Sequence, residues 1–215
     1  MTPVLVEVVK NIRNVTERNY MNFDEQKIIE VAQPYFTFAR AGDWEHAGRV
    51  VKWVKEIGQG RDDLYLIVVA AYIHDIGWSG VAPKGKIDDL DKMLALEPQA
   101  NANSARLVSE VLLKLNFTEE EIKTVNRLVA AADKHRSNME DEEIIVDADS
   151  LSKLCIEHMQ EKYEPQSFAS FLKLWKDELP SRIRTQKGRE LFPKLLTDLE
   201  QKLGLSQEMK PFKTK

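Results

Sequence analysis

The sequence predicts an all-α fold in a single domain, and three observations support this prediction. Apolar residues recur at spacings of three and four through most of the chain, the period of a helix with one buried face. No stretch alternates apolar and polar residues long enough to indicate a strand. No repeat or linker divides the 215 residues, so we expect one bundle of about nine or ten helices over residues 1–204 and a flexible tail over 205–215.

The first half of the chain predicts four helices. Asp43 is a candidate N-cap, and Gly58 follows the apolar stripe that begins there. The fourth segment is apolar nearly all round, which indicates a helix at the centre of the bundle. Gly77 ends this pattern and begins a loop rich in glycine. The expected helices span residues 5–15, 24–39, 43–58 and 61–76.

The second half predicts five more helices, with clearer boundaries. Asn116 can adopt the left-handed conformation that ends a helix. Thr118 and Glu121 have the spacing of a capping box, which indicates a helix start at Thr118. Pro98 is expected to break the helix before it, and Pro180 to kink or split a later one. The expected helices span residues 89–115, 118–133, 144–160, 166–186 and 189–203.

Composition narrows the class of protein. Hydrophobic residues make up 43% and charged residues 31%, which is ordinary for a globular protein and excludes collagen-like and fully disordered chains. The net charge of −4 disfavours a nucleic-acid partner. A single cysteine, Cys155, excludes a disulfide framework and favours a reducing, cytoplasmic location. The longest apolar run, residues 64–73, is far shorter than the roughly 20 residues that cross a bilayer, so no membrane span is expected.

The chain has four histidines, and two of them lie beside candidate acidic partners. His46 shares the apolar stripe of its predicted helix, and His74–Asp75 ends the most buried segment. Asp147 and Asp149 begin another apolar segment. A single histidine on an apolar face is usually a core residue, and a buried carboxylate needs a partner. Two imidazoles with two carboxylates suit a divalent transition ion that keeps open positions for water or substrate.

Three motifs around these residues resemble those of the HD-domain metal-dependent phosphohydrolases. Residues 43–50, D-W-E-H-A-G-R-V, look like the D-x-x-H-x-x-R-V opening of that family. Residues 68–77, V-V-A-A-Y-I-H-D-I-G, look like its A-x-x-H-D-I-G element. Residues 147–151, D-A-D-S-L, look like its D-A-D-x-L segment. Their order and spacing also fit, and the clear resemblance covers about residues 43–155.

The resemblance implies an HD-type helical bundle around one or two divalent metal ions. Carried over residue by residue, the ligands are His46, His74, Asp75 and Asp149. Asp147 stays a rival for the last place, because both aspartates lie at the margins of an apolar face and helical phase does not decide between them. Asp147 could instead cap its helix, and the A-D-x-L register favours Asp149. The family's two-metal members carry a further histidine before the S-A pair that is Ser104-Ala105 here, and this chain lacks it. We therefore expect one ion, which could be Mn, Fe, Co, Ni or Zn.

The activity that the resemblance implies is hydrolysis of a small phosphate ester, a nucleotide by family habit, with a metal-activated water. Asp75 would orient the water, and Arg49 and His135 would stabilise the phosphate. Two alternatives stay open for these residues: Arg49 could pair with a structural carboxylate, and His135 could have no role at the site. Two other classes of function also stay open, namely a non-catalytic HD domain that binds metal or nucleotide as a regulatory module, and a helical interaction protein. We also allow for a homodimer.

Overall fold

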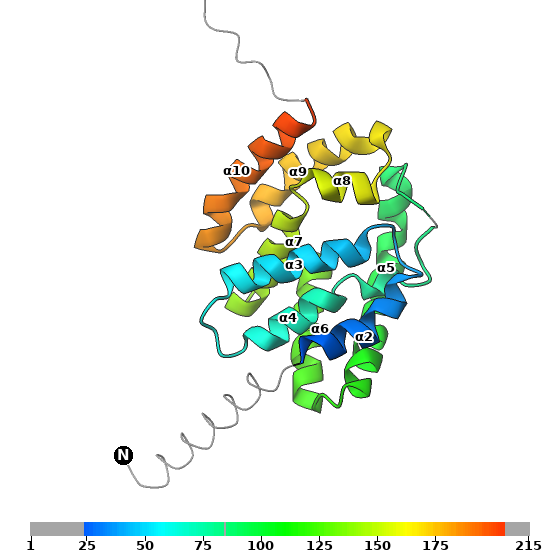
Figure 1. Ribbon diagram of the computed structural model, residues 1–215, viewed down its shortest axis with the longest axis vertical. Helices are drawn as coiled ribbons and strands as arrows, with labels where there is room; N and C mark the ends of the chain where they lie inside the picture. The colour runs from blue at the N-terminus through cyan, green and yellow to red at the C-terminus, as the bar shows by residue number, and fades with distance from the viewer. Residues whose placement is uncertain (1–23, 84, 205–215) are drawn as a thin grey trace, which may run out of the picture.

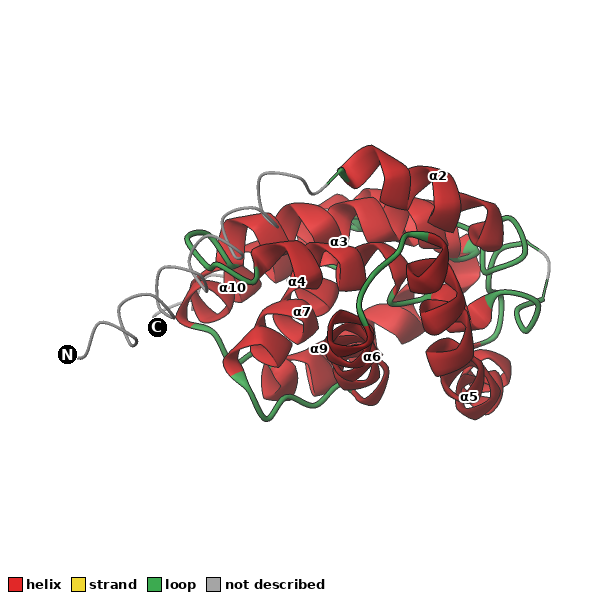
Figure 2. Cartoon of the chain, turned by 90° about the horizontal axis from the view of Figure 1, so that it is seen from below, coloured by secondary structure: helices red, strands yellow, loops and turns green. Residues whose placement is uncertain are grey.

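The protein is an all-α bundle, as the sequence predicts. The computed structural model describes residues 24–83 and 85–204, and within these ranges there are nine α-helices, two short 3-10 turns and no strand (Figure 2). The expected helix over residues 5–15 and the expected tail over 205–215 lie outside the described residues. The helices are α2 (Glu25–Phe36), α3 (Asp43–Ile57), α4 (Leu64–Ile73), α5 (Leu90–Lys114), α6 (Glu119–Lys134), α7 (Glu140–Ser152), α8 (Ile156–Lys162), α9 (Phe168–Arg182) and α10 (Gln186–Lys202).

The core consists of two hydrophobic clusters. In the larger, α4 lies in the middle and packs against α2, α3, α6 and α7, which buries nine of its ten residues (Figure 1). This confirms the central helix expected from its uniformly apolar sequence. The smaller cluster holds α8, α9 and α10 together at one end of the molecule around Met159, Phe171 and Leu179 (Figure 1). None of the described helices combines the length and apolar character that a membrane span requires.

Local signals at helix ends are confirmed where the partners are close in sequence. The Thr118 side chain accepts from the Glu121 backbone N–H, and the Glu121 carboxylate accepts from the Thr118 N–H, which completes the capping box. Asn116 has φ +59°, the left-handed conformation expected there. The expected N-cap at Asp43 is wrong: Gly42 takes that position with φ +73°, and Asp43 is the first residue of α3.

Two proline predictions differ from the structure. Pro98 lies inside the continuous helix α5, and Pro180 lies inside α9 just before its end. Both prolines are exposed. Solvent can therefore hydrate the backbone carbonyl that each proline leaves without an N–H donor, so neither ends its helix.

The helix expected over residues 144–160 is divided in two. It begins earlier, at Glu140, and a break at Lys153–Cys155 separates α7 from α8, with Cys155 in extended conformation. The Ser152 hydroxyl lies at the break and contacts both its own helix and His46 on α3. Contacts between helices thus define this boundary, and the apolar period does not show it.

Candidate metal centre

His46 points inward from α3 and is completely buried. Its Nδ1 lies 3.0 Å from the hydroxyl oxygen of Ser152. That hydroxyl donates its only hydrogen to the carbonyl of Asp149 at 2.7 Å, so it can only accept from His46. The His46 Nδ1 therefore carries the proton, and the Nε2 lone pair is free to bind a cation.

His74 and Asp75 follow the last residue of α4, where the chain turns into the 3-10 turn η1 (Ile76–Trp78). The Nδ1 of His74 lies 2.8 Å from the carbonyl oxygen of Ala71, which can only accept. His74 thus donates from Nδ1, and its Nε2 faces His46. Both imidazoles are oriented by a hydrogen bond from the far nitrogen, the arrangement that metal-binding histidines adopt.

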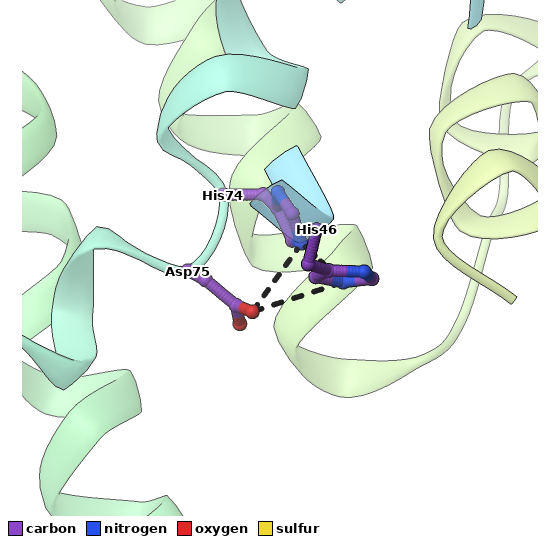
Figure 3. Close-up of side chains that lie close together, drawn as sticks. All are labelled: His46, His74 and Asp75. Atoms are coloured by element: carbon purple, nitrogen blue, oxygen red, sulfur yellow. Dashed lines mark hydrogen bonds and ion pairs between the residues drawn. The ribbon is translucent and has the colours of Figure 1, made fainter. Parts of the chain in front are cut away.

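Four side chains converge at this point from α3, α4 and α7. The two Nε2 atoms of His46 and His74 are 3.3 Å apart. Asp75 Oδ2 lies 3.8 Å from the first and 3.6 Å from the second, as the close-up shows (Figure 3). Asp149 Oδ1 lies 3.0 Å from His46 Nε2 and 3.7 Å from His74 Nε2. Ligands about 2.1 Å from one ion are separated by about 3.0–3.4 Å, close to these spacings.

The chemistry of this group fits a divalent cation. Burial is the main cause that lowers the pKa of His46 to about 3, and the charge of Lys162 adds to it, so this imidazole is neutral near pH 7. The facing atoms are then the Nε2 lone pair of His46, the Nε2 atom of His74 and two carboxylate oxygens. Such atoms repel one another at these distances, and an ion bound among them removes the repulsion. We name His46, His74, Asp75 and Asp149 the acceptor cluster.

Asp147 and Asp149 have different surroundings, although both are buried. Asp147 faces the turn before α10, where it accepts from the backbone N–H groups of Arg184 and Thr185, each at 2.9 Å, and from the Thr185 hydroxyl at 2.6 Å. Its hydrogen bonds therefore hold α10 against α7. Asp149 faces the two imidazoles, so the geometry favours it over Asp147 as the fourth ligand.

Three basic side chains contact the carboxylates of the site. The Nη2 of Arg40 lies 2.6 Å from Asp75 Oδ2, and Lys153 Nζ lies 2.6 Å from Asp149 Oδ2. Lys162 Nζ reaches Asp75 Oδ2 at 3.4 Å. Burial would raise the pKa of Asp75, but the charges of Arg40 and Lys162 outweigh it and hold that pKa well below its usual range. Burial would likewise raise the pKa of Asp149, but the charge of Lys153 outweighs it and holds that pKa well below its usual range.

Asp43 supports these cations. Its carboxylate accepts from the backbone N–H of Arg40 at 3.0 Å and pairs with the Arg40 Nε at 3.1 Å and with Lys162 Nζ at 2.5 Å. Asp43 is fully buried, so these are its compensating partners. Its side chain organises the site, and this explains why it does not cap the backbone of α3.

A cavity of about 220 Å³ opens beside the acceptor cluster. His74, Asp75 and Asp149 reach its wall, and the indole of Trp78 lies there under the guanidinium of Arg40 at 3.9 Å. The cavity could therefore admit a small ligand to the cluster. Four basic side chains share its wall: Arg40, Lys153, Lys162 and Arg182.

Of the two other residues expected at the site, His135 and Arg49, only the first lies in the cavity wall. His135 lines the cavity, with Nε2 3.6 Å from Glu97 Oε1 and Nδ1 buried without a hydrogen-bond partner. Arg49 instead pairs with Glu161 at 2.7 Å and does not reach the cavity wall. Of the alternatives left open, the geometry favours a structural pairing for Arg49.

His158 packs on the acceptor cluster from α8. Its ring centroid lies 4.7 Å from that of His46, and the side chain is completely buried. The Nδ1 atom lies 3.4 Å from the donor Arg49 Nη2, so the proton belongs on Nε2. His158 is a packing residue that fixes the His46 ring.

The sequence prediction missed Arg40, Lys153 and Lys162. Lys153 has a local signal, because it follows Asp149 by four residues, the spacing of neighbours on one helix face. Arg40 is near Asp43 in sequence, but it lies in the loop before α3, where helical spacing does not apply. Lys162 has no such signal, since its partners are 87 or more residues away.

Comparison with known proteins identifies no relative of this chain. No family model matches the chain, and neither a curated protein nor a solved structure is significantly similar to it.

Proposed function

We propose that this protein is a metal-dependent phosphohydrolase of the HD type, which cleaves a phosphate ester with a metal-activated water. The observation that supports the proposal is the group His46, His74 and Asp75, whose ligand atoms are close enough to hold one metal ion. Asp149 lies beside both imidazoles, and the wall of the adjoining cavity includes four basic side chains among its charged residues. Neutral imidazoles and carboxylates are the ligands of catalytic transition ions, and basic side chains stabilise the charge of a transferring phosphoryl group.

Each side chain has a role in this proposal. The ion, held by the acceptor cluster, would lower the pKa of a water and neutralise charge on the phosphoryl group. Asp75 would orient that water, because its carboxylate lies both in the cluster and in the cavity wall. Arg40, Lys153 and Lys162 would hold the phosphate oxygens, a role that the sequence assigned to Arg49. His135 would contact the substrate through its unpaired Nδ1.

The identity of the ester rests on the resemblance alone. A nucleotide is the habit of the HD family, and none of the contacts above selects a base. The regulatory alternative uses the same ion and cavity without turnover, and turnover separates it from the enzyme.

The test compares two isosteric variants that differ in which aspartate loses its charge. We expect Asp149→Asn to weaken Mn²⁺ binding at least tenfold and to lower phosphate release by several orders of magnitude, since a ligand is lost. We expect Asp147→Asn to keep the ion and to lose only stability. Elemental analysis, Mn²⁺ titration and a phosphatase screen over nucleotides and sugar phosphates measure these effects.

Three outcomes have different meanings. A wild-type protein without ion after metal-supplemented purification refutes the metal site. One ion per chain without hydrolysis of any ester supports the regulatory module. Equal loss of ion in the two variants contradicts the assignment of Asp149.

A further inference from the structure

The buried charges of the site balance without an ion. Three carboxylates, Asp43, Asp75 and Asp149, contact three cations, and each of these six side chains is at most 14% exposed. The cations are Arg40, Lys153 and Lys162. The net charge of this group is therefore zero.

The outer wall of the cavity carries further charges of both signs. Glu178 pairs with Arg182, whereas the Glu97 carboxylate, 3.6 Å from the His135 imidazole, adds one negative charge. Asp133 also faces the cavity, and burial raises the pKa of its carboxyl group to about 7, so it is only partly charged at neutral pH. A divalent ion entering the acceptor cluster would thus give the six buried side chains an excess of positive charge that Glu97 and the partly charged Asp133 offset only in part, which is costly.

The ion would also compete with the cations for the same oxygens. Asp75 Oδ2, the atom that faces both imidazoles, is the atom that Arg40 and Lys162 contact. When an ion coordinates this oxygen, the contacts of Arg40 and Lys162 with it become weaker. Both side chains line the cavity, as does Lys153, so an anion in the cavity could take up these donors.

We infer that the ion and a phosphate dianion bind this site cooperatively, each raising the affinity for the other, and that the three buried cations cause this coupling. The inference rests on the proposed function and adds a property to it: the protein holds its metal weakly until a doubly charged phosphate group arrives. A dianion cancels the excess charge of the ion and accepts the hydrogen bonds that the carboxylates give up. Because binding free energies are reciprocal, the metal-free protein should also bind phosphate weakly.

Lys153 allows a direct test. Lys153→Met removes one cation with little change in volume, so the site without an ion would carry one negative charge. We expect this variant to bind Mn²⁺ more tightly than wild type in the absence of phosphate and to respond less to phosphate. Lys176→Met is the matched control, because Lys176 pairs with Glu200 on the surface, remote in sequence from the cluster.

The experiment titrates Mn²⁺ into the full-length protein in chloride buffer and in inorganic phosphate buffer of equal ionic strength, corrected for the Mn²⁺ that phosphate binds in solution. We expect phosphate to raise the Mn²⁺ affinity of wild type and of Lys176→Met at least tenfold. In Lys153→Met we expect the increase to fall below threefold.

An Mn²⁺ affinity of wild type that is the same in both buffers overturns the inference, as does a full phosphate effect in Lys153→Met. If phosphate esters are hydrolysed without such coupling, the inference fails and the proposed function stands. If coupling is observed but no ester is hydrolysed, the inference stands and the proposed function fails. If no Mn²⁺ binds in either buffer, both fail.

Discussion

Asp133 shows how the site changes the acidity of a single residue. Burial is the main cause that raises the pKa of its carboxyl group from 3.8 to about 7, and the negative charges of Asp75 and Asp149 add to this effect. A hydrogen bond from Ser104 acts in the opposite direction but does not cancel it. The folded protein therefore binds a proton at Asp133 that the unfolded chain releases near pH 4.

This difference predicts a pH-dependent stability. Since the folded pKa is the higher one, the contribution of Asp133 to stability is present below about pH 4 and is lost as the pH rises toward 7. We expect the free energy of unfolding of Asp133→Asn, measured relative to wild type, to be higher at pH 8 than at pH 4 by on the order of 2 kcal/mol. Urea denaturation in the presence of a chelator measures the effect, with exposed Asp62→Asn as the control. A stability difference that does not change with pH would contradict the prediction.

The turn η1 is the element that places Asp75, and α5 holds it in place. A Cβ atom at Gly77 would overlap the carbonyl oxygen of Ala100 and the hydroxyl of Ser104, so the turn lies directly on the helix. The side-chain amide of Asn103 donates to the Gly77 carbonyl at 3.0 Å and to the Ser79 carbonyl at 3.2 Å. Asn103 therefore holds the turn against α5.

We expect Gly77→Ala to push η1 away from α5. The overlap involves backbone as well as side chain, so the change should cost about 1–3 kcal/mol of stability and should weaken Mn²⁺ binding by displacing Asp75. Gly48→Ala is the matched control, because nothing lies within 4 Å of its Cβ position and alanine favours helix α3. We expect it to gain about 0.5–1 kcal/mol and to leave the Mn²⁺ affinity unchanged. Thermal unfolding and Mn²⁺ titration test both, and a stable Gly77→Ala with normal affinity would show that η1 can adjust.

On the scale of the whole molecule, the acceptor cluster lies where the two hydrophobic clusters meet. His46 and Asp149 belong to α3 and α7, and His74 directly follows α4; apolar residues of these helices contribute to the larger cluster. Lys162 ends α8 beside the smaller one. The cores on both sides consist of apolar side chains, which are not ligands of an ion, although Tyr163, Phe171 and Trp175 of the smaller cluster line the cavity. Helix packing therefore does not depend on an ion, unlike that of a small zinc finger.

The chelated protein should remain a cooperatively folded helical bundle. An ion that binds only the folded state raises the free energy of unfolding by about 2.7 kcal/mol when its concentration is 100 times its Kd. Mn²⁺ with phosphate should therefore raise the Tm by roughly 5–10 °C. Circular dichroism melts with chelator, with Mn²⁺ and with Mn²⁺ plus phosphate measure this, and Asp149→Asn should show little increase. Loss of helix on chelation would mean that the ion holds the fold together.

Short-range signals in the sequence were sufficient for most of the helices. The capping box at Thr118, the left-handed Asn116 and the apolar run of α4 involve neighbours along the chain, and the structure confirms each of them. The sequence also singled out His46, His74, Asp75 and Asp149, which the fold brings together.

Tertiary structure decided what depends on partners far apart in the chain. α7 is buried on several sides, so its period could not separate Asp147 from Asp149; contacts with the turn before α10 and with the imidazoles did. Tertiary structure also brings Lys162 to Asp75, which lies 87 residues away along the chain. Helical periodicity tells which residues are buried, but the direction and partner of a buried charge follow from the packing of the helices, because electrostatic energy depends on distance in space.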